Sequence, residues 1–173
     1  KDNLRIILQK KSDYGKLDKK NKTANIEWVS ANPTGPLHAG HGRHVCLGKA
    51  VANLLECVGY DVTREYYYND AGLQMNNLAD STQQMYYRII DPEHEHPLPE
   101  DGYKGKYIED IANNLFIKYE DTLKDSDSEI FKTESEDYNF KNIRNTLSKL
   151  GIHQDVFFNE TTLYKKNYIN NLL

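Results

Sequence analysis

The chain has 173 residues, of which 38% are hydrophobic and 28% charged, and its formal net charge is −4 at pH 7. This composition excludes a disordered chain and fits a globular fold with a large polar surface. No apolar run approaches the roughly 18 residues of a membrane span, and the net negative charge excludes binding of nucleic acid by overall charge alone. Two cysteines cannot form a disulfide scaffold, so we expect a reducing, cytoplasmic environment.

The first 24 residues differ in charge from the rest of the chain. Residues 1–22 contain eight Lys/Arg and three Asp/Glu, whereas residues 120–137 contain eight acids and two lysines. Gly15 and the polar stretch at 19–22 interrupt any apolar pattern in the basic segment. We therefore interpret residues 1–24 as a basic leader, which is either a solvated helix or a linker.

Two predicted strands and a helix follow the leader. Alternating apolar and polar residues at 25–29 predict a strand, and the β-prone run at 61–68 predicts a second. Between them, apolar residues spaced three and four apart predict an amphipathic helix that starts near Gly40 and stops at Gly59.

A second helix is expected over residues 73–90, with Asn69 or Asp70 as its N-cap. The order strand, helix, strand, helix predicts an α/β fold with a parallel βαβ unit over residues 25–90. Ligands in such sheets bind at the carboxyl ends of the strands, so the loops at 30–41 and 69–72 are the expected site.

Residues 91–150 predict an acidic loop followed by helices. The segment 91–101 contains three prolines and five acids, which indicates a surface loop. Helical spacing recurs over 107–119. A capping box of Ser126 and Glu129 predicts a further helix that ends near Gly151.

The last part of the chain, residues 151–173, predicts one more strand and one more helix. Residues 155–160 are typical of a short strand. A helix is expected to start at Thr161 or Thr162 and to be still running at Leu172 and Leu173.

The loop between the first strand and helix has the composition of an anion site. Its residues 30–43 read SANPTGPLHAGHGR. Pro33 and Pro36 stiffen the loop, and Gly40 permits close approach of a flat ligand to the backbone. The helix that follows directs free N–H groups and its positive dipole end at the loop. His38 and His41 share one face of the first turn and can donate hydrogen bonds to phosphate oxygens.

Other interpretations of the two histidines remain open. His38 and His41, with His44 one turn further on, have a spacing at which two histidines can bind a metal ion. No cysteine or carboxylate lies nearby at ligand spacing, so we expect no metal site in the chain. A purely structural histidine pair in a turn is the other alternative. The dinucleotide-binding G-x-G-x-x-G pattern and the P-loop pattern are both missing from the sequence.

Two blocks of sequence resemble a known family. The string at 32–41, NPTGPLHAGH, resembles the HIGH signature of class I aminoacyl-tRNA synthetases. The wider block at 27–43, together with GYDVTREYY at 59–67 and NDAG at 69–72, resembles arginyl-tRNA synthetases of the bacterial type. The segments 103–107 and 155–160 resemble the same family more loosely. The resemblance implies a Rossmann-like parallel sheet, here the first half of the catalytic domain, with a mainly helical insertion at 91–150.

The resemblance also implies an activity and assigns residues to it. The activity is ATP-dependent activation of L-arginine to arginyl-adenylate, with Mg²⁺ accompanying the ATP, and then transfer to tRNA(Arg). His38 and His41 take the catalytic roles. The resemblance assigns ATP binding to Pro36, Leu37, His38, Gly40 and His41. It assigns arginine binding to Ser30, Ala31, Asn32, His41 and Glu160, with Asp155 as the alternative carboxylate for the guanidinium.

The chain departs from a whole family member. A KMSK-like loop, an anticodon-binding domain and a complete N-terminal domain are missing from its sequence. We therefore expect a fragment that is inactive alone, in which residues 151–173 begin a truncated continuation and tRNA contacts lie mainly elsewhere. Another HxGH-type nucleotidyltransferase and a non-catalytic synthetase-like module are the alternatives. The block at 30–32 and the second block at 59–72 argue against the former.

Overall fold

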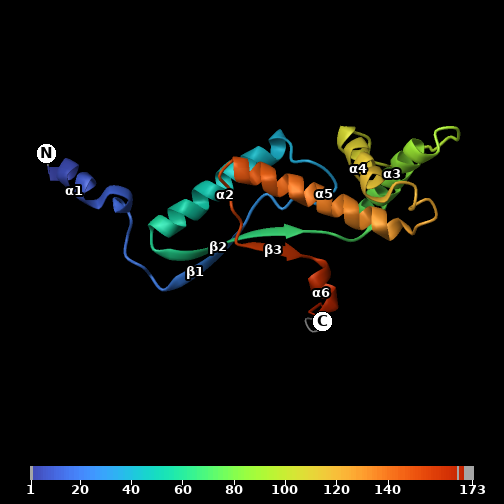
Figure 1. Ribbon diagram of the computed structural model, residues 1–173. Coiled ribbons are helices and arrows are strands. Elements are labelled where there is room, and N and C mark those ends of the chain that lie inside the picture. Colours follow the sequence, from blue (N-terminus) through green and yellow to red (C-terminus); the bar gives the residue numbers. More distant parts are fainter. Residues whose placement is uncertain (1, 167, 170–173) are drawn as a thin grey trace.

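A three-stranded parallel sheet lies at the centre of the fold (Figure 1), in a computed structural model that describes residues 2–166 and 168–169. Its strands are β1 (Lys22–Glu27), β2 (Tyr60–Tyr68) and β3 (Val156–Asn159), hydrogen-bonded in the order β1-β2-β3. Glu27 lies beside Glu65 in the β1–β2 register, and Tyr68 lies beside Asn159 in the β2–β3 register. The expected α/β fold with parallel strands is confirmed.

Helix α2 (Ala39–Cys57) connects β1 to β2 and covers one face of the sheet (Figure 1). The helix lies where predicted, but its buried residues are Val45, Gly48 and Ala52. Leu47, Val51 and Leu54, which contribute to the apolar spacing that predicted the helix, are exposed. Gly59 follows the helix with φ +92°, a left-handed conformation that glycine adopts without a steric penalty. The predicted stop signal is therefore confirmed.

Helix α5 (Ser128–Lys149) takes part in two hydrophobic cores. Near its start, Phe131 packs in a helical core with α3 (Leu73–Ile90) and α4 (Lys106–Tyr119). Near its end, α5 packs in a sheet core with α2 and β2, through Phe140, Ile143 and Leu147. Figure 1 shows α5 running from the sheet to the helical unit, so this one helix joins the two parts of the fold.

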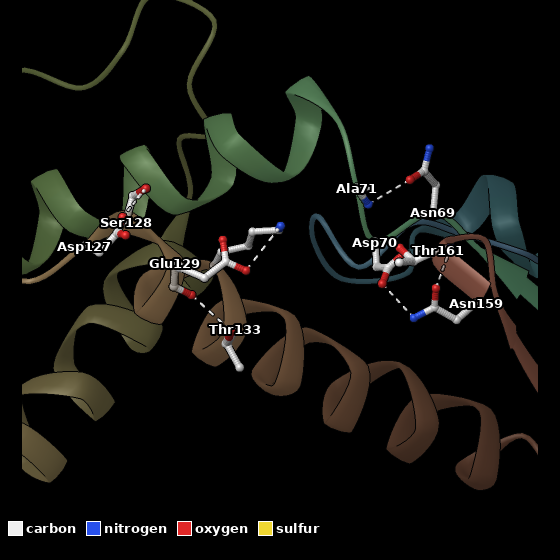
Figure 2. Close-up of polar contacts among 10 residues, drawn as sticks. Asn69, Asp70, Ala71, Asp127, Ser128, Glu129, Thr133, Asn159 and Thr161 are labelled. Carbon is white, nitrogen blue, oxygen red and sulfur yellow. Dashed lines mark hydrogen bonds and ion pairs between the residues drawn. The ribbon is translucent and has the colours of Figure 1, made fainter. Parts of the chain in front are cut away.

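The expected N-cap of α3 is wrong. Helix α3 begins directly after Gly72, and the polar residues before it are used elsewhere. The Asn69 side-chain oxygen accepts a hydrogen bond from the backbone N–H of Ala71 at 2.8 Å, as Figure 2 shows. Asp70 accepts hydrogen bonds from Asn159 and Thr161 instead. The turn before α3 is thereby tied to the end of β3.

The expected capping box of α5 is also wrong, by one residue. Asp127 is the N-cap residue and α5 starts at Ser128, so Ser126 lies in the preceding turn. Figure 2 shows the Ser128 hydroxyl donating to the Asp127 carboxylate. The backbone carbonyl of Glu129 accepts a hydrogen bond from the Thr133 hydroxyl, one turn further along. The helix ends before Gly151, whose φ is +66°, as expected.

The two ends of the chain flank this structure. Helix α1 (Asp2–Lys10) and the short 3₁₀ turn at Lys11–Asp13 are exposed, as expected for a solvated leader (Figure 1). Helix α6 (Thr161–Lys165) starts where predicted. Its expected continuation to Leu172 and Leu173 lies outside the described residues. Within the described ranges, the structure has no helix with the length and hydrophobicity of a membrane span.

The packing of α2 on the sheet can be tested at Gly48. A Cβ atom added there would lie 2.1 Å from the Trp28 ring. Gly48→Ala should lower the free energy of unfolding by about 2 kcal/mol, because an overpacked core must shift. In Gly42→Ala, the matched control on the same helix, the added Cβ meets nothing within 4 Å. This control should be neutral or stabilising by about 0.5 kcal/mol. Urea unfolding followed by the fluorescence of Trp28 measures both, and equal stabilities would contradict the packing.

Candidate functional site

The backbone turns sharply where β1 ends. Val29 and Ser30 have φ of +72° and +43°. A left-handed conformation is costly for a β-branched residue such as valine, so the surrounding structure must hold it in place. Val29 is buried, and it packs in the sheet core. The two residues take the chain out of the sheet and into the loop that leads to α2.

Side chains of this loop replace the lost strand pairing. The Ser30 hydroxyl oxygen accepts a hydrogen bond from the Tyr67 N–H at 3.1 Å, and the Asn32 side-chain oxygen accepts one from the Asn69 N–H at 3.0 Å. The fully buried Tyr66 hydroxyl donates to the Ala31 carbonyl at 2.8 Å and accepts from the Ala31 N–H at 3.1 Å. Because buried backbone groups require partners, these contacts define the path of the loop.

The first turn of α2 is held by two histidines that act as reciprocal caps. The Nδ1 atom of His38 accepts a hydrogen bond from the Gly40 N–H, and the Nδ1 atom of His41 accepts one from the His38 N–H, both at 3.1 Å. Their rings stack with centroids 3.8 Å apart. An Nδ1 atom that accepts a hydrogen bond carries no proton, so each neutral ring carries its proton on Nε2.

The environment keeps His41 in this neutral form. Burial, followed by the neighbouring imidazoles of His38 and His44, lowers the pKa of His41 below its ordinary value. A neutral ring with its proton on Nε2 is a hydrogen-bond donor that does not repel a second imidazole. The turn therefore combines two imidazole donors with the positive end of the α2 dipole, which suits a phosphate ligand.

A cavity of about 400 Å³ lies beside this turn. Five of the residues predicted to bind ATP or arginine line it, namely Ala31, Asn32, Pro36, His38 and His41. The other predicted residues are placed differently. Leu37 packs against the sheet core, and Gly40 lies beneath the His38 ring, so that an added Cβ would be 2.9 Å from Cε1 of His38. Ser30 lies at the sheet edge, beside Tyr67.

The sequence matches the model of the protein family described as "tRNA synthetases class I (R), catalytic domain" over residues 3–166. It is 48% identical to an arginine–tRNA ligase of Desulfotalea psychrophila and 51% identical to one of Chlorobaculum parvum, each over 149 residues. Each alignment covers 86% of this chain and 27% of the relative. The chain belongs to the class I arginyl-tRNA synthetase family. It spans about a quarter of the length of these curated relatives.

Solved structures agree with the family assignment. An arginyl-tRNA synthetase of Campylobacter jejuni superposes with a TM-score of 0.86 and 32% identity, over 95% of this chain and 36% of that one. An arginyl-tRNA synthetase of Thermus thermophilus has a TM-score of 0.59 and 21% identity, over 90% of this chain and 26% of that one. The second likeness shows the shared Rossmann-like fold.

Two carboxylates lie near the carboxyl ends of the strands, close to Tyr67. Glu160 follows β3, and its backbone N–H donates to the Tyr68 carbonyl at 3.0 Å. Burial raises the pKa of Tyr67, and the nearby carboxylates of Glu160 and, more weakly, Glu27 add to this shift. Glu27 was not among the residues predicted to bind a ligand. The available signals were its position at the end of the first strand and its place at the start of the block at 27–43.

Asp155, the alternative carboxylate, is already engaged at the other end of β3. It precedes the strand and accepts a hydrogen bond from the Arg64 N–H at 2.8 Å, with the Arg64 guanidinium 3.8 Å away. Sequence reasoning also missed Gln74, Tyr103 and Tyr107, which complete the lining of the cavity. The two tyrosines belong to a segment with a loose resemblance to the family, which was the one available signal for them.

The neutral state of His41 can be tested by titration. Its imidazole should titrate below the ordinary histidine range near pH 6.5, measured by the NMR shift of Cε1–H. Because folding disfavours the charged ring, this group should lower the free energy of unfolding as the pH falls through that window. His38→Gln removes one cause and should raise the pKa, whereas His44→Gln should raise it less. A His41 pKa unaffected by His38→Gln would contradict the pairing.

Proposed function

We propose that this chain supplies the ATP-phosphate and amino-acid side of the active site of an arginine–tRNA ligase. The reaction joins L-arginine to ATP as arginyl-adenylate, with release of pyrophosphate, and then transfers arginine to tRNA(Arg) in the cytoplasm. The observation that carries this proposal is the pair of imidazoles at the start of α2, whose Nδ1 atoms accept backbone N–H groups and which line a cavity of about 400 Å³.

In the proposed activation step, the two histidines and the start of α2 stabilise the charge that develops on the phosphate. The arginine carboxylate attacks the α-phosphorus of ATP, and negative charge builds on the phosphate oxygens as pyrophosphate leaves. His38 and His41 donate from Nε2 to those oxygens, and the dipole of α2 adds to the stabilisation. Mg²⁺ would arrive with the ATP as part of the substrate complex. Pro36, Leu37 and Gly40 shape the loop so that the nucleotide can approach the backbone.

The amino-acid end would lie next to the loop after β1. Ser30, Ala31 and Asn32 are proposed to contact the α-amino and carboxylate groups of arginine, together with His41. Among the described residues, the Ser30 and Asn32 side-chain oxygens each accept one hydrogen bond, which leaves lone pairs for this task, whereas the Asn32 Nδ2 atom donates to Gln74. Glu160, with Glu27 nearby, is proposed to bind the guanidinium, because a planar cation pairs best with carboxylates.

Other parts of the reaction would need residues that this chain does not contain. The relatives are several times longer than this chain, so we propose that the second phosphate-binding loop and most tRNA contacts belong to the remainder of such a protein. Residues 1–24 would be the leader, 25–90 the nucleotide-binding half, 91–150 the insertion and 151–173 the continuing catalytic domain. Helix α3 precedes residue 91 in the sequence, but its buried residues pack in the same core as those of α4 and α5, so we group it with the insertion.

The phosphate role predicts a loss of nucleotide affinity in His38→Gln. Removing a donor to an anionic phosphate should weaken binding of a non-hydrolysable ATP analogue with Mg²⁺ about tenfold. His44→Gln is the matched control, because His44 is an exposed imidazole on the same helix. Isothermal titration calorimetry measures both variants. Equal affinity of the His38 variant and the unmodified chain would argue against the phosphate role.

The guanidinium role predicts a loss of discrimination in Glu160→Gln. The unmodified chain should prefer L-arginine over L-citrulline, which has a neutral urea group in place of the guanidinium. Loss of the carboxylate should reduce this preference about tenfold. Asp155→Asn is the control and should keep the ratio, because Asp155 pairs with Arg64. If Asp155→Asn removed the preference and Glu160→Gln did not, the assignment of the two carboxylates would be reversed.

A further inference from the structure

Two helices of the insertion hold successive carbonyl groups of the loop that precedes the histidines. The Nδ2 atom of Asn139, on α5, donates to the Pro33 carbonyl at 2.8 Å. The hydroxyl of Tyr107, on α4, donates to the Thr34 carbonyl at 3.0 Å. Asn139 is only 1% exposed, so its amide is directed at the loop from inside the protein.

The next loop residue is held by packing. A Cβ atom added at Gly35 would lie 3.3 Å from Cζ of Tyr107, so the ring rests closely on the glycine backbone. Burial raises the pKa of Tyr107 to about 12, which keeps its hydroxyl protonated as a donor. Three successive residues, Pro33, Thr34 and Gly35, are therefore held from the insertion side.

Tyr107 is itself fixed within the insertion. The Ser81 hydroxyl oxygen, on α3, accepts a hydrogen bond from the Tyr103 N–H at 2.9 Å. The preceding Gly102 has no room for a side chain, because an added Cβ would lie 2.8 Å from the Ser81 Oγ atom. The segment that leads into α4 is thus fixed to α3, and α4 carries the Tyr107 side chain whose hydroxyl contacts the loop.

These contacts differ from those made by the sheet. Ser30, Asn32 and Tyr66 determine how the loop leaves β1, whereas the insertion acts on the part that leads into His38. We propose that Tyr107 and Asn139 are positioning residues, which use the insertion to hold residues 33–35 so that the imidazoles of His38 and His41 stay directed at the ligand. The effect of this positioning on catalysis rests on the proposed function, whereas the restraint that the two residues place on the loop does not.

Hydrogen exchange of this chain tests the grip directly. In Tyr107→Phe, the ring stays and the hydrogen bond to Thr34 is lost. The amides of His38 and Gly40, which are hydrogen-bonded within the turn, should exchange about fivefold faster, as expected for one lost hydrogen bond. Asn139→Ala should act in the same direction. Because Tyr107→Phe keeps its packing, the test does not depend on whether the Asn139 variant folds.

The matched control is Tyr87→Phe. The Tyr87 hydroxyl also donates to a backbone carbonyl within the insertion, that of Lys124, at 2.8 Å. This variant should leave exchange of His38 and Gly40 unchanged, so it separates a local grip from a general loss of stability. The proposal is overturned if exchange in the loop is unaffected by Tyr107→Phe, or if Tyr87→Phe accelerates it equally.

Nucleotide binding by the same variants separates this proposal from the proposed function. Tyr107→Phe should weaken binding of the ATP analogue about threefold, because the histidines are less well ordered, while Tyr87→Phe should not. A chain that binds no analogue, but whose loop still loosens in Tyr107→Phe, would refute the proposed function and leave the positioning role intact. Unchanged exchange together with normal analogue binding would refute only the positioning role.

Discussion

The structure depends on how the loop after β1 satisfies its backbone hydrogen bonds. At Val29 and Ser30 the chain turns out of the sheet through left-handed conformations, and strand pairing ends there. Side chains then take over as partners, because backbone groups that a partly buried loop withdraws from water need hydrogen bonds. Tyr66 binds both backbone groups of Ala31. The Ser30 side chain accepts from Tyr67 within β2, and the Asn32 side chain accepts from Asn69 directly after it. The shape of the cavity follows from these contacts.

The histidine turn combines a structural and a chemical task in the same two side chains. Each imidazole uses Nδ1 to cap the helix, which leaves Nε2–H free for a ligand. A serine or aspartate would cap the helix equally well but would offer no such second donor. The same arrangement explains why the rings stack closely without repulsion, since burial favours the neutral state of His41.

Local patterns in the sequence predicted most of the fold. The spacing of apolar residues located α2 and α4, and alternation located the first strand, because these signals arise within one element. The N-cap of α3 was mispredicted for a different reason. Asp70 could cap a helix, but it is drawn instead to Asn159 and Thr161, which follow a strand far along the chain. No local signal reports such a competing partner.

The connection between β1 and α2 was expected at 30–41 from its composition and its position after a strand, and the structure begins α2 at Ala39. The partners that support it were not predicted. Asn139 and Tyr107 come from helices whose periodic pattern specifies only which face is buried. Whether a buried polar residue meets another helix or the backbone of a distant loop is a property of tertiary packing. The wall of the cavity formed by Tyr103 and Tyr107 was therefore missed.

The pairing of β2 with β3 has a consequence for how the protein folds. Residues 69–155 lie between these two neighbouring strands, so their contacts join parts of the chain that are far apart in sequence. Closing so long a loop has a high entropic cost, and contacts of this kind slow folding. The helical insertion, rich in local contacts, would form first and bring the two strand ends together. Addition of β3 would then be the late step that completes the sheet.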